Sequence, residues 1–287
     1  MNEESASSSL LISCIIPTCD RPLLLRRAVD SVLGQTSKPL EVIVVNNGRL
    51  PVDLASDAQT ALRVVEAIPY FGVAQARNVG AILARGEYLA FLDDDDAWPP
   101  EYLETIGQDL AAGAQCVLAR IDKQLGAEVL PWKNPGSRIT PDMLFLRNTG
   151  AGGSNIVVSR RLFYEIGGYD PALLTGQDKG LVIEILLAGH RVDASLDVAI
   201  AAGQPTGRRQ TDHARMSQGK TAFFRKYRRF MRWDQRLGIR MQIEWYRWRG
   251  DDAGRVIAFL KYLFLRSLYS VTSILRWPRS RGRGTRI

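Results

Sequence analysis

The hydrophobic and polar positions change their spacing several times in the first third of the chain. Residues 10–17, LLISCIIP, form an apolar run rich in Ile and Leu, which is typical of a buried parallel strand. Apolar residues then recur at three- and four-residue spacing between 24 and 32, which predicts an amphipathic helix that ends at Gly34. We expect Asp20 to cap this helix and Pro22 to lie in its first turn.

Strand and helix patterns continue to alternate up to about residue 110. Short apolar runs predict strands at 41–45, 63–67 and 88–92. Residues 72–85 have the period of a helix, and Gly86 is a suitable end for it. This alternation predicts an α/β fold with a mostly parallel sheet flanked by helices.

The pattern is less regular in the middle of the chain. Residues 113–154 contain several prolines and glycines, and we assign no element to them. A short strand is predicted at 156–158, and helices are predicted at 161–166 and 178–188. The chain therefore returns to strand and helix periods after this irregular stretch.

Charge divides the chain unevenly. The net charge is +8, but residues 208–287 hold 21 Lys or Arg against 5 Asp or Glu, a balance of +16, which leaves −8 for residues 1–207. We predict a folded domain over 10–205 and a basic helical arm over 206–287, whose partner should be anionic. Within the arm, helix breaks are expected near Gly219 and Gly238.

The N-terminus and the cysteines both favour a cytoplasmic protein. Residues 1–9, MNEESASSS, have acids and serines where a signal peptide needs a basic stretch, and we expect a disordered tail there. The three cysteines, Cys14, Cys19 and Cys116, have no metal-ligand spacing, which fits free thiols in a reducing compartment.

Residues 256–277 are apolar at 15 of 22 positions, but Lys261, Arg266 and Arg276 lie inside the segment. A spanning helix needs about twenty apolar residues with few charges, so the pattern favours a helix lying in the interface of an anionic membrane. The alternative is an arm packed on the domain with a solvated basic face. We exclude nucleic acid as the partner because no nucleic-acid-binding module is recognisable.

The most specific chemical signal is the run Asp93 to Asp96, which directly follows the apolar strand YLAFL. Adjacent carboxylates repel one another, and a hard divalent cation would relieve that repulsion. In open α/β sheets ligands bind beyond the carboxyl ends of strands, where this run is expected to lie. The alternative is a solvated acidic turn that caps the next helix.

The chain resembles family 2 glycosyltransferases of the GT-A fold from Leu11 to Val192. Four segments carry the resemblance, in the same order as in that family: IIPTCDRPLLLRRAVDSVLGQT, EVIVVNNG, GVAQARNVGAILARGEYLAFLDDDDAW and GGSNIVVSRRLFYEIGGYDPALLTGQDKGLVIEILLAGH. The resemblance implies a GT-A, Rossmann-like domain that transfers a sugar with inversion. The donor would be a UDP- or dTDP-sugar, bound with Mn²⁺ or Mg²⁺.

The resemblance also implies roles for individual residues on the nucleotide side. Base and ribose would be held by the loop that follows the first strand and by the end of the second strand, at Pro17, Thr18, Asp20, Arg21, Asn46 and Asn47. The family usually has Asp where Asn46 and Asn47 stand. An Asn oxygen can still accept a hydrogen bond from a base N–H, although without charge. An ordinary turn explains Asn46 and Asn47 equally well.

The acidic run matches the family's DxD motif. Asp95 would contact the metal, while Asp93 and Asp94 would contact the ribose or the waters of the metal. Arg77 matches an Arg that lies near the base or the phosphates, and a guanidinium can fork onto phosphate oxygens. The alternative for Arg77 is an exposed arginine on a helix.

Asp178 matches the second position of the family's acidic pair at a helix start and would be the catalytic base. Gln177 replaces the commoner acid beside it. A plain helix N-cap is the alternative for Asp178. His213 resembles a late His near the diphosphate in some relatives and is a candidate metal ligand, or else a loop residue without a role.

Together these residues predict a hexosyltransferase of the cell-envelope polysaccharide type, peripheral on the inner face of the cell membrane. The acceptor would be a glycan or a lipid-linked saccharide. A nicotinamide-dependent dehydrogenase is excluded because the turn after the first strand, PTCDRP, is not G-x-G-x-x-G. An aspartyl phosphatase would need its Asp pair after the first strand, whereas here the pair Asp93 and Asp95 follows the fourth. A catalytically idle partner of another transferase stays an alternative, since Asn46, Asn47 and Gln177 depart from the family pattern.

Overall fold

The computed structural model describes residues 10–54, 60–125, 128–133, 135–136, 138–202, 212–250 and 254–275. The predicted tail over 1–9 and the end of the predicted interface segment, from Arg276 onward, lie outside the described residues.

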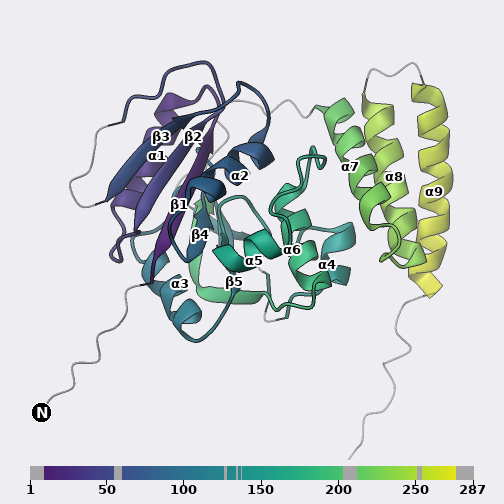
Figure 1. The fold of residues 1–287 in the computed structure, drawn as a ribbon. Coiled ribbons are helices and arrows are strands. Elements are labelled where there is room, and N and C mark those ends of the chain that lie inside the picture. Colours follow the sequence, from purple (N-terminus) through teal and green to yellow (C-terminus); the bar gives the residue numbers. More distant parts are fainter. Residues whose placement is uncertain are drawn as a thin grey trace, which may run out of the picture. The chain divides into compact units, whose positions relative to one another are not determined.

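The chain alternates strands and helices through its first part and ends in helices (Figure 1). The strands are β1 Ile12–Thr18, β2 Glu41–Asn46, β3 Ala61–Glu66, β4 Tyr88–Phe91, β5 Cys116–Leu125, β6 Glu128–Lys133, β7 Ile156–Ser159 and β8 Asp193–Ala202. The helices are α1 Pro22–Leu33, α2 Val73–Leu83, α3 Tyr102–Ala111, α4 Pro141–Leu146, α5 Arg160–Glu165, α6 Gln177–Leu187, α7 His213–Tyr227, α8 Trp233–Arg249 and α9 Arg255–Leu275.

The described strands form one mixed sheet in the order β3-β2-β1-β4-β7-β5-β6, with β8 paired to β5. The pairs among β1 to β4 are parallel, as is β5 with β8, while β7 is antiparallel to both β4 and β5. The predicted α/β fold with a flanked sheet is therefore confirmed.

The strands β1, β2 and β4 are buried on both faces of the sheet, and successive side chains along each strand point to opposite faces. Ile16 and Val44 point to one face and join a core with residues of α1 and α3. On the other face Gly80 of α2 lies so close to Ile15 that a Cβ would overlap its side chain. Phe91 packs there against Phe163 of α5, with the ring centres 5.6 Å apart and the rings tilted by 35°.

Two local predictions are wrong. Asp20 does not cap α1: the N-cap residue is Arg21, whose side chain makes no capping bond, and the Asp20 carboxylate accepts backbone N–H groups elsewhere. The C-terminal helices do not break at Gly219 and Gly238, which are buried inside α7 and α8. The break falls instead between Tyr227 and Trp233.

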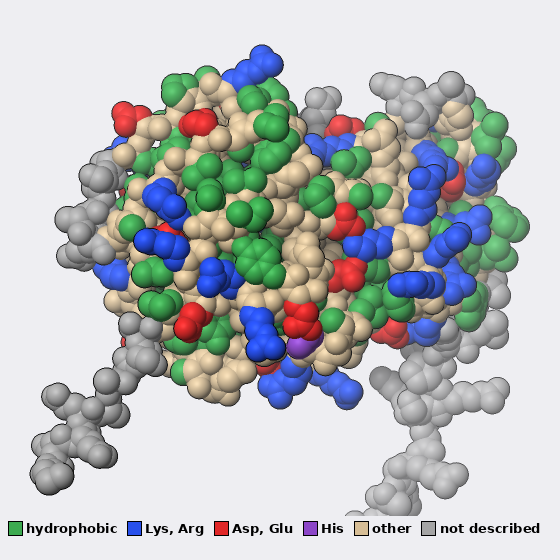
Figure 2. Space-filling view, in the orientation of Figure 1, with side chains coloured by type: hydrophobic (Ala, Val, Ile, Leu, Met, Phe, Trp, Pro, Cys, Tyr) green, Lys and Arg blue, Asp and Glu red, His purple; other side chains and the backbone are tan. Residues whose placement is uncertain are grey.

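Contacts divide the chain into two compact units. The first comprises residues 1–171 and 177–209, and the second comprises 172–176 and 210–287. In the second unit α8 packs against both α7 and α9, and Figure 2 shows many Lys and Arg side chains over these helices. The division predicted at residue 205 stays a prediction. Among the described helices, none has the length and apolar content needed to cross a bilayer.

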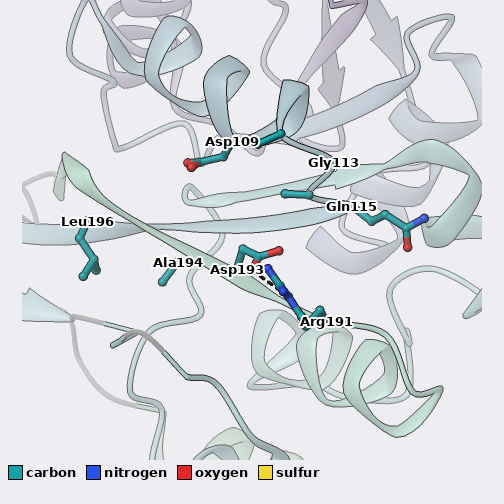
Figure 3. Close-up of a pocket in the computed structure, with 9 residues that line it drawn as sticks. Asp109, Gly113, Gln115, Arg191, Asp193, Ala194 and Leu196 are labelled. Carbon is teal, nitrogen blue, oxygen red and sulfur yellow. Dashed lines mark hydrogen bonds and ion pairs between the residues drawn. The ribbon is translucent and has the colours of Figure 1, made fainter.

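A hollow of about 550 Å³ opens at the edge of the sheet where β5 and β8 begin (Figure 3). Asp109, Gln115 and Leu196 line it, and Arg191 donates a hydrogen bond of 3.1 Å to Asp193 within it. Because β4 and β5 run in the same direction, this edge is opposite to the carboxyl end of β4.

Candidate functional site

The acidic run lies where the strand order of the sheet reverses. From β1 the chain proceeds outward through β2 and β3, and then returns to form β4 on the other side of β1. Open α/β sheets form their ligand crevices at such a switch point, beyond the carboxyl ends of the strands. Asp93 to Asp96 follow β4 at this position, and Thr18 ends the neighbouring β1.

Asp94 is tied to the loop after β1. Its carboxylate accepts a hydrogen bond of 2.8 Å from Thr18 Oγ1 and one of 3.2 Å from Arg21. Arg21 also lies 3.4 Å from Asp95. Burial raises the pKa of Asp94 above its ordinary value, and the bonds from Thr18 and Arg21 oppose that rise only in part. The loop after β1 and the acidic run therefore form one connected cluster.

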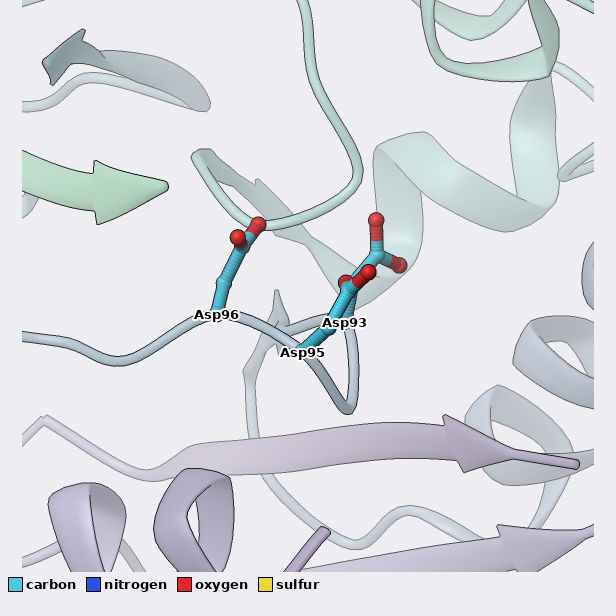
Figure 4. A group of neighbouring side chains, drawn as sticks. All are labelled: Asp93, Asp95 and Asp96. Atoms are coloured by element: carbon cyan, nitrogen blue, oxygen red, sulfur yellow. The ribbon is translucent and has the colours of Figure 1, made fainter. Parts of the chain in front are cut away.

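Three carboxylates of the run can converge on one point. Asp93, Asp95 and Asp96 each offer an oxygen within 4.8 Å of the others (Figure 4). Oxygen donors at this spacing suit a hard cation such as Mg²⁺ or Mn²⁺. Among the described residues, this is the one group of acids, cysteines and histidines that meets this spacing.

Arg77 joins the acidic run to α6. Its side chain, 2% exposed, donates to Asp93 and makes a second bond of 2.7 Å to Asp178. Its guanidinium also lies 4.9 Å from the ring centre of Tyr169. Burial by itself lowers the pKa of Arg77, but Asp93 and Asp178 outweigh burial and raise that pKa above its ordinary value. Arg77 is thus a permanent buried cation between two carboxylates and not an exposed arginine.

The loop before β7 leaves room for the ion pair between Arg77 and Asp93. A Cβ on Gly153 would overlap both the Arg77 guanidinium and the Asp93 carboxylate. The Ser154 hydroxyl donates to Asp96 and accepts the backbone N–H of Asp93. Asn155, fully buried, donates to Gly150 O and accepts from Gly152 N, so the loop is held by its own amide groups.

Trp98 belongs to the packing of this region. Its indole N–H donates to Ser154 O over 2.8 Å, and its ring stacks on Tyr102 at 4.4 Å between centres. The side chain is buried. Trp98 thus connects the end of the acidic run with the loop before β7 and with α3.

Asp20 and Tyr70 form a second cluster beside the end of β2. Both have left-handed backbone, with φ of 56° and 61°, which is costly for a side chain as large as that of Tyr. The Tyr70 hydroxyl donates to Asp20 over 2.8 Å, and the N–H groups of Arg49 and Leu50 donate to the same carboxylate. The bond from Leu50, followed by those from Tyr70 and Arg49, lowers the pKa of Asp20.

The two asparagines at the end of β2 are both buried: Asn46 is the last residue of the strand and Asn47 follows it. Asn46 donates to Leu50 O and Glu66, and its oxygen accepts the N–H of Gly48, so its amide shapes the turn. Asn47 bonds through its backbone to Thr18 O. Pro17 pairs with Val45 within the sheet and is buried.

His213 lies in the second unit, at the start of α7. Its ring lies 5.9 Å from the ring centres of both Trp245 and Tyr246. Its Nδ1 is buried without a hydrogen-bond partner. A metal role for His213 stays a prediction.

Residues of the first unit that the sequence singled out thus form linked clusters around the ends of β1, β2 and β4. The contacts of Tyr70, Gly153 and Ser154 were not predicted. Gly153 and Ser154 lie in the segment GGSN that carries part of the resemblance, but Tyr70 has no sequence signal, because a Tyr with positive φ is unusual.

Comparisons with known proteins agree with this arrangement. The model of the family described as Glycosyl transferase family 2 matches residues 13–167. An uncharacterized glycosyltransferase of Haemophilus influenzae is 26% identical over 186 residues, covering 61% of this chain and 62% of that protein. A glucosyl-dolichyl phosphate glucuronosyltransferase of Haloferax volcanii is 28% identical over 165 residues, half of each chain. This chain therefore spans less than two thirds of the length of these relatives.

Two solved structures show the same fold. The mannosyltransferase PcManGT from Pyrobaculum calidifontis, in complex with GDP-Man and Mn²⁺, aligns with a TM-score of 0.58 at 18% identity, covering 93% of this chain and 81% of that one. TarS of S. aureus, residues 1–349 in complex with UDP-GlcNAc, aligns with a TM-score of 0.60 at 15% identity, covering 94% of this chain and 93% of that one.

Proposed function

The chain belongs to glycosyl transferase family 2, and from this membership we propose that it is an inverting, metal-dependent glycosyltransferase. The observation that carries the proposal is the Arg77 bridge, because it holds Asp178 close to the acidic run that would bind the donor. A donor-binding group and a candidate base on separate elements are what a direct displacement requires.

We assign the base to Asp178. Its carboxylate would take the proton of the acceptor hydroxyl while that oxygen attacks the anomeric carbon of the sugar. The new C–O bond forms as the bond from the anomeric carbon to the diphosphate oxygen breaks, and attack opposite the leaving group inverts the configuration. Support comes from the position of Asp178 in the first turn of α6 and from its bond of 2.7 Å to Arg77.

The acidic run would hold a divalent cation, Mn²⁺ or Mg²⁺, with Asp95 as the direct ligand. The convergence of the carboxylate oxygens of Asp93, Asp95 and Asp96 supports this assignment. When bound, such an ion neutralises the charge that develops on the departing nucleoside diphosphate. His213 is a further candidate ligand.

The nucleotide side of the site would be formed by the loops after β1 and β2. Thr18 and Arg21, already bonded to Asp94, would lie beside the ribose and phosphates. Asp20, Asn47 and Pro17 would border the base. Because the amide of Asn46 is bonded within its own turn, its contribution would be to fix that turn. We expect a UDP- or dTDP-sugar as the donor.

The acceptor would be a glycan or a lipid-linked saccharide, and the enzyme would work at the inner, anionic face of the cell membrane. The balance of +16 over residues 208–287 supports the membrane location. Cell-envelope polysaccharide synthesis is the process that fits this acceptor class.

The test is a panel of nucleotide sugars assayed for metal-dependent binding and slow hydrolysis. We expect Asp178→Asn to bind the donor as the wild type does but to lose at least ~100-fold in turnover, because it removes the base. We expect Asp95→Asn to lose metal-dependent binding. Asp30→Asn, which changes an exposed carboxylate on α1, is the matched control.

Two outcomes would contradict the proposal. If Asp178→Asn hydrolyses the donor at the wild-type rate, Asp178 is not the base. If the wild type binds no nucleotide with or without metal, the enzyme reading fails and the idle-partner alternative replaces it.

A further inference from the structure

Helix α9 has two apolar faces, and one of them packs inside the second unit. Ala258 and Leu265 are buried, and the rings of Phe259 and Tyr262 pack against Trp248 of α8, with ring centres 4.7 Å and 6.1 Å apart. This packing explains why the face of α9 that is turned toward α8 is apolar.

The opposite face of α9 is also apolar, but it is exposed. Val256 is 71% exposed, Leu260 59% and Phe264 64%, at the four-residue spacing that places side chains on one side of a helix. Three more exposed side chains border this row, and the exposed apolar face consists of Val256, Ile257, Leu260, Leu263, Phe264 and Leu268. At 100° per residue, Val256, Leu260, Leu263 and Phe264 lie on the side away from Ala258 and Leu265, and Ile257 and Leu268 lie at its border.

Exposed cations lie on both sides of this exposed apolar face. At 100° per residue, Lys261 falls next to Leu268, and Arg266 and Arg255 fall about 60° and 80° beyond Leu263 on the other side, next to Phe259 and Tyr262. All three are exposed, and residues 255–275 contain no Asp or Glu. Long basic side chains beside an apolar stripe can keep their charges in water or at headgroups while their stems follow the stripe. Figure 2 shows hydrophobic side chains along the edge where α9 lies, with Lys and Arg beside them.

Two kinds of partner bury an exposed apolar face: a lipid surface or another protein surface. A second copy of this chain would bring the rims of Lys261, Arg255 and Arg266 against identical cations, and like charges oppose that association. An anionic bilayer offers acyl chains to the apolar face and negative headgroups to both rims at once.

We propose that the exposed apolar face of α9 is the membrane-docking surface, on which the helix lies parallel to an anionic bilayer without crossing it. This inference rests on the membrane location in the proposed function and specifies the residues that make the contact. Lipid binding does not require transfer chemistry, so it can fail while nucleotide binding succeeds, and the reverse.

The test is co-sedimentation of the full chain with vesicles of phosphatidylcholine containing roughly 30% phosphatidylglycerol, beside pure phosphatidylcholine. We expect the double variant Leu260→Ser, Phe264→Ser to lower the partition coefficient roughly tenfold or more, because two apolar side chains no longer enter the bilayer. The matched control is Leu23→Ser with Ile82→Ser, which removes two side chains that are 88% and 68% exposed on α1 and α2.

A charge variant separates the electrostatic contribution to vesicle binding from the apolar contribution. Lys261→Glu with Arg266→Glu should abolish the preference for anionic vesicles, and added salt should weaken wild-type binding. Circular dichroism of each variant reports whether its helices persist. Equal vesicle binding by wild type and the Leu260→Ser, Phe264→Ser variant would overturn the proposal. So would dimers in sedimentation velocity that this variant dissociates, with no vesicle binding by the wild type, since the face would then join two copies.

Discussion

At the scale of single residues, Arg77 is the side chain on which the candidate site depends most. It is 2% exposed and bonded to both Asp93 and Asp178, whose side chains are 33% and 21% exposed. A buried ion that loses its partners is strongly destabilising, whereas an exposed pair contributes little. The cation therefore stabilises the fold and positions the two carboxylates by the same contacts.

We expect Arg77→Gln to lower the free energy of unfolding by about 3 kcal/mol, because it leaves two nearby carboxylates without their shared cation. Arg77→Lys should fall between Gln and the wild type, since an ammonium keeps the charge but not the two-pronged geometry. Urea denaturation at neutral pH measures both. Arg26→Gln, at an exposed position of α1, is the control. A stability of Arg77→Gln equal to that of the control would show that the bridge is energetically neutral.

At the scale of elements, the sequence predicted the strands and helices up to α2 and β4 within a few residues, because buried parallel strands are continuous apolar runs. β5, β6 and β8 were missed, since polar or proline residues interrupt their apolar pattern. The predicted break at Gly219 was wrong for a packing reason: a Cβ there would overlap Thr175, so this glycine serves close approach and does not end the helix.

The candidate site was predictable to the same extent as its elements. Adjacent acids after an apolar run are visible in one dimension, as Asp93 to Asp96 show. The partners of these acids are not, because Ser154 and Arg77 meet them only through the pairing of β4 with β7 and the packing of α2.

Glu41 is the first residue of β2 and links β1, β2 and β3 at the edge of the sheet opposite to the candidate site. Its carboxylate, fully buried, accepts from Ser13 of β1, from Arg63 of β3 and from the N–H of Arg85. Burial by itself raises the pKa of Glu41, but these hydrogen bonds and ion pairs outweigh burial, and the pKa is lowered from its ordinary value of 4.5. Folding therefore favours the ionised form.

We expect Glu41→Gln to lower the free energy of unfolding by about 3 kcal/mol at pH 7. A carboxyl whose pKa is lowered by folding contributes its full stability above the unfolded pKa and loses it as pH falls through the folded pKa. The difference between wild type and variant should thus be constant from pH 7 to about 5 and should shrink below 4.5. Urea denaturation across this range measures it, with Glu87→Gln, at an exposed position, as control. A difference independent of pH would contradict the ionised state of Glu41.

At the scale of the whole molecule, the chain consists of two units with different character. The first carries the sheet and the acidic run, and the second consists largely of the helices α7, α8 and α9. Most candidate donor-site residues lie in the first unit, and His213 alone of them lies in the second. The parts that would bind donor and membrane are therefore separate in the chain.

Hydrogen exchange with and without UDP and Mn²⁺ tests which residues are protected when the donor site is occupied. We expect slower exchange at the ends of β1, β2 and β4, because ligand binding suppresses local opening. If His213 is a metal ligand, protection should extend to the first turn of α7, and His213→Ala should remove it there. Protection confined to the first unit would contradict a role for His213, and α9 serves as the internal control.

The Arg77 bridge also bears on how an enzyme of this kind is made. The growing chain emerges from the ribosome with its N-terminus first. The helix α2 and the acidic run therefore emerge well before α6 is synthesised. Until Asp178 arrives, the buried guanidinium has one of its two carboxylates, and this half of the sheet lacks a stabilising contact. Chains that end before α6 should therefore be more readily degraded by proteases than the full chain, and they would lack the carboxylate that we propose as the base. The ion pair that steadies this half of the sheet would thus form only once α6 has been synthesised.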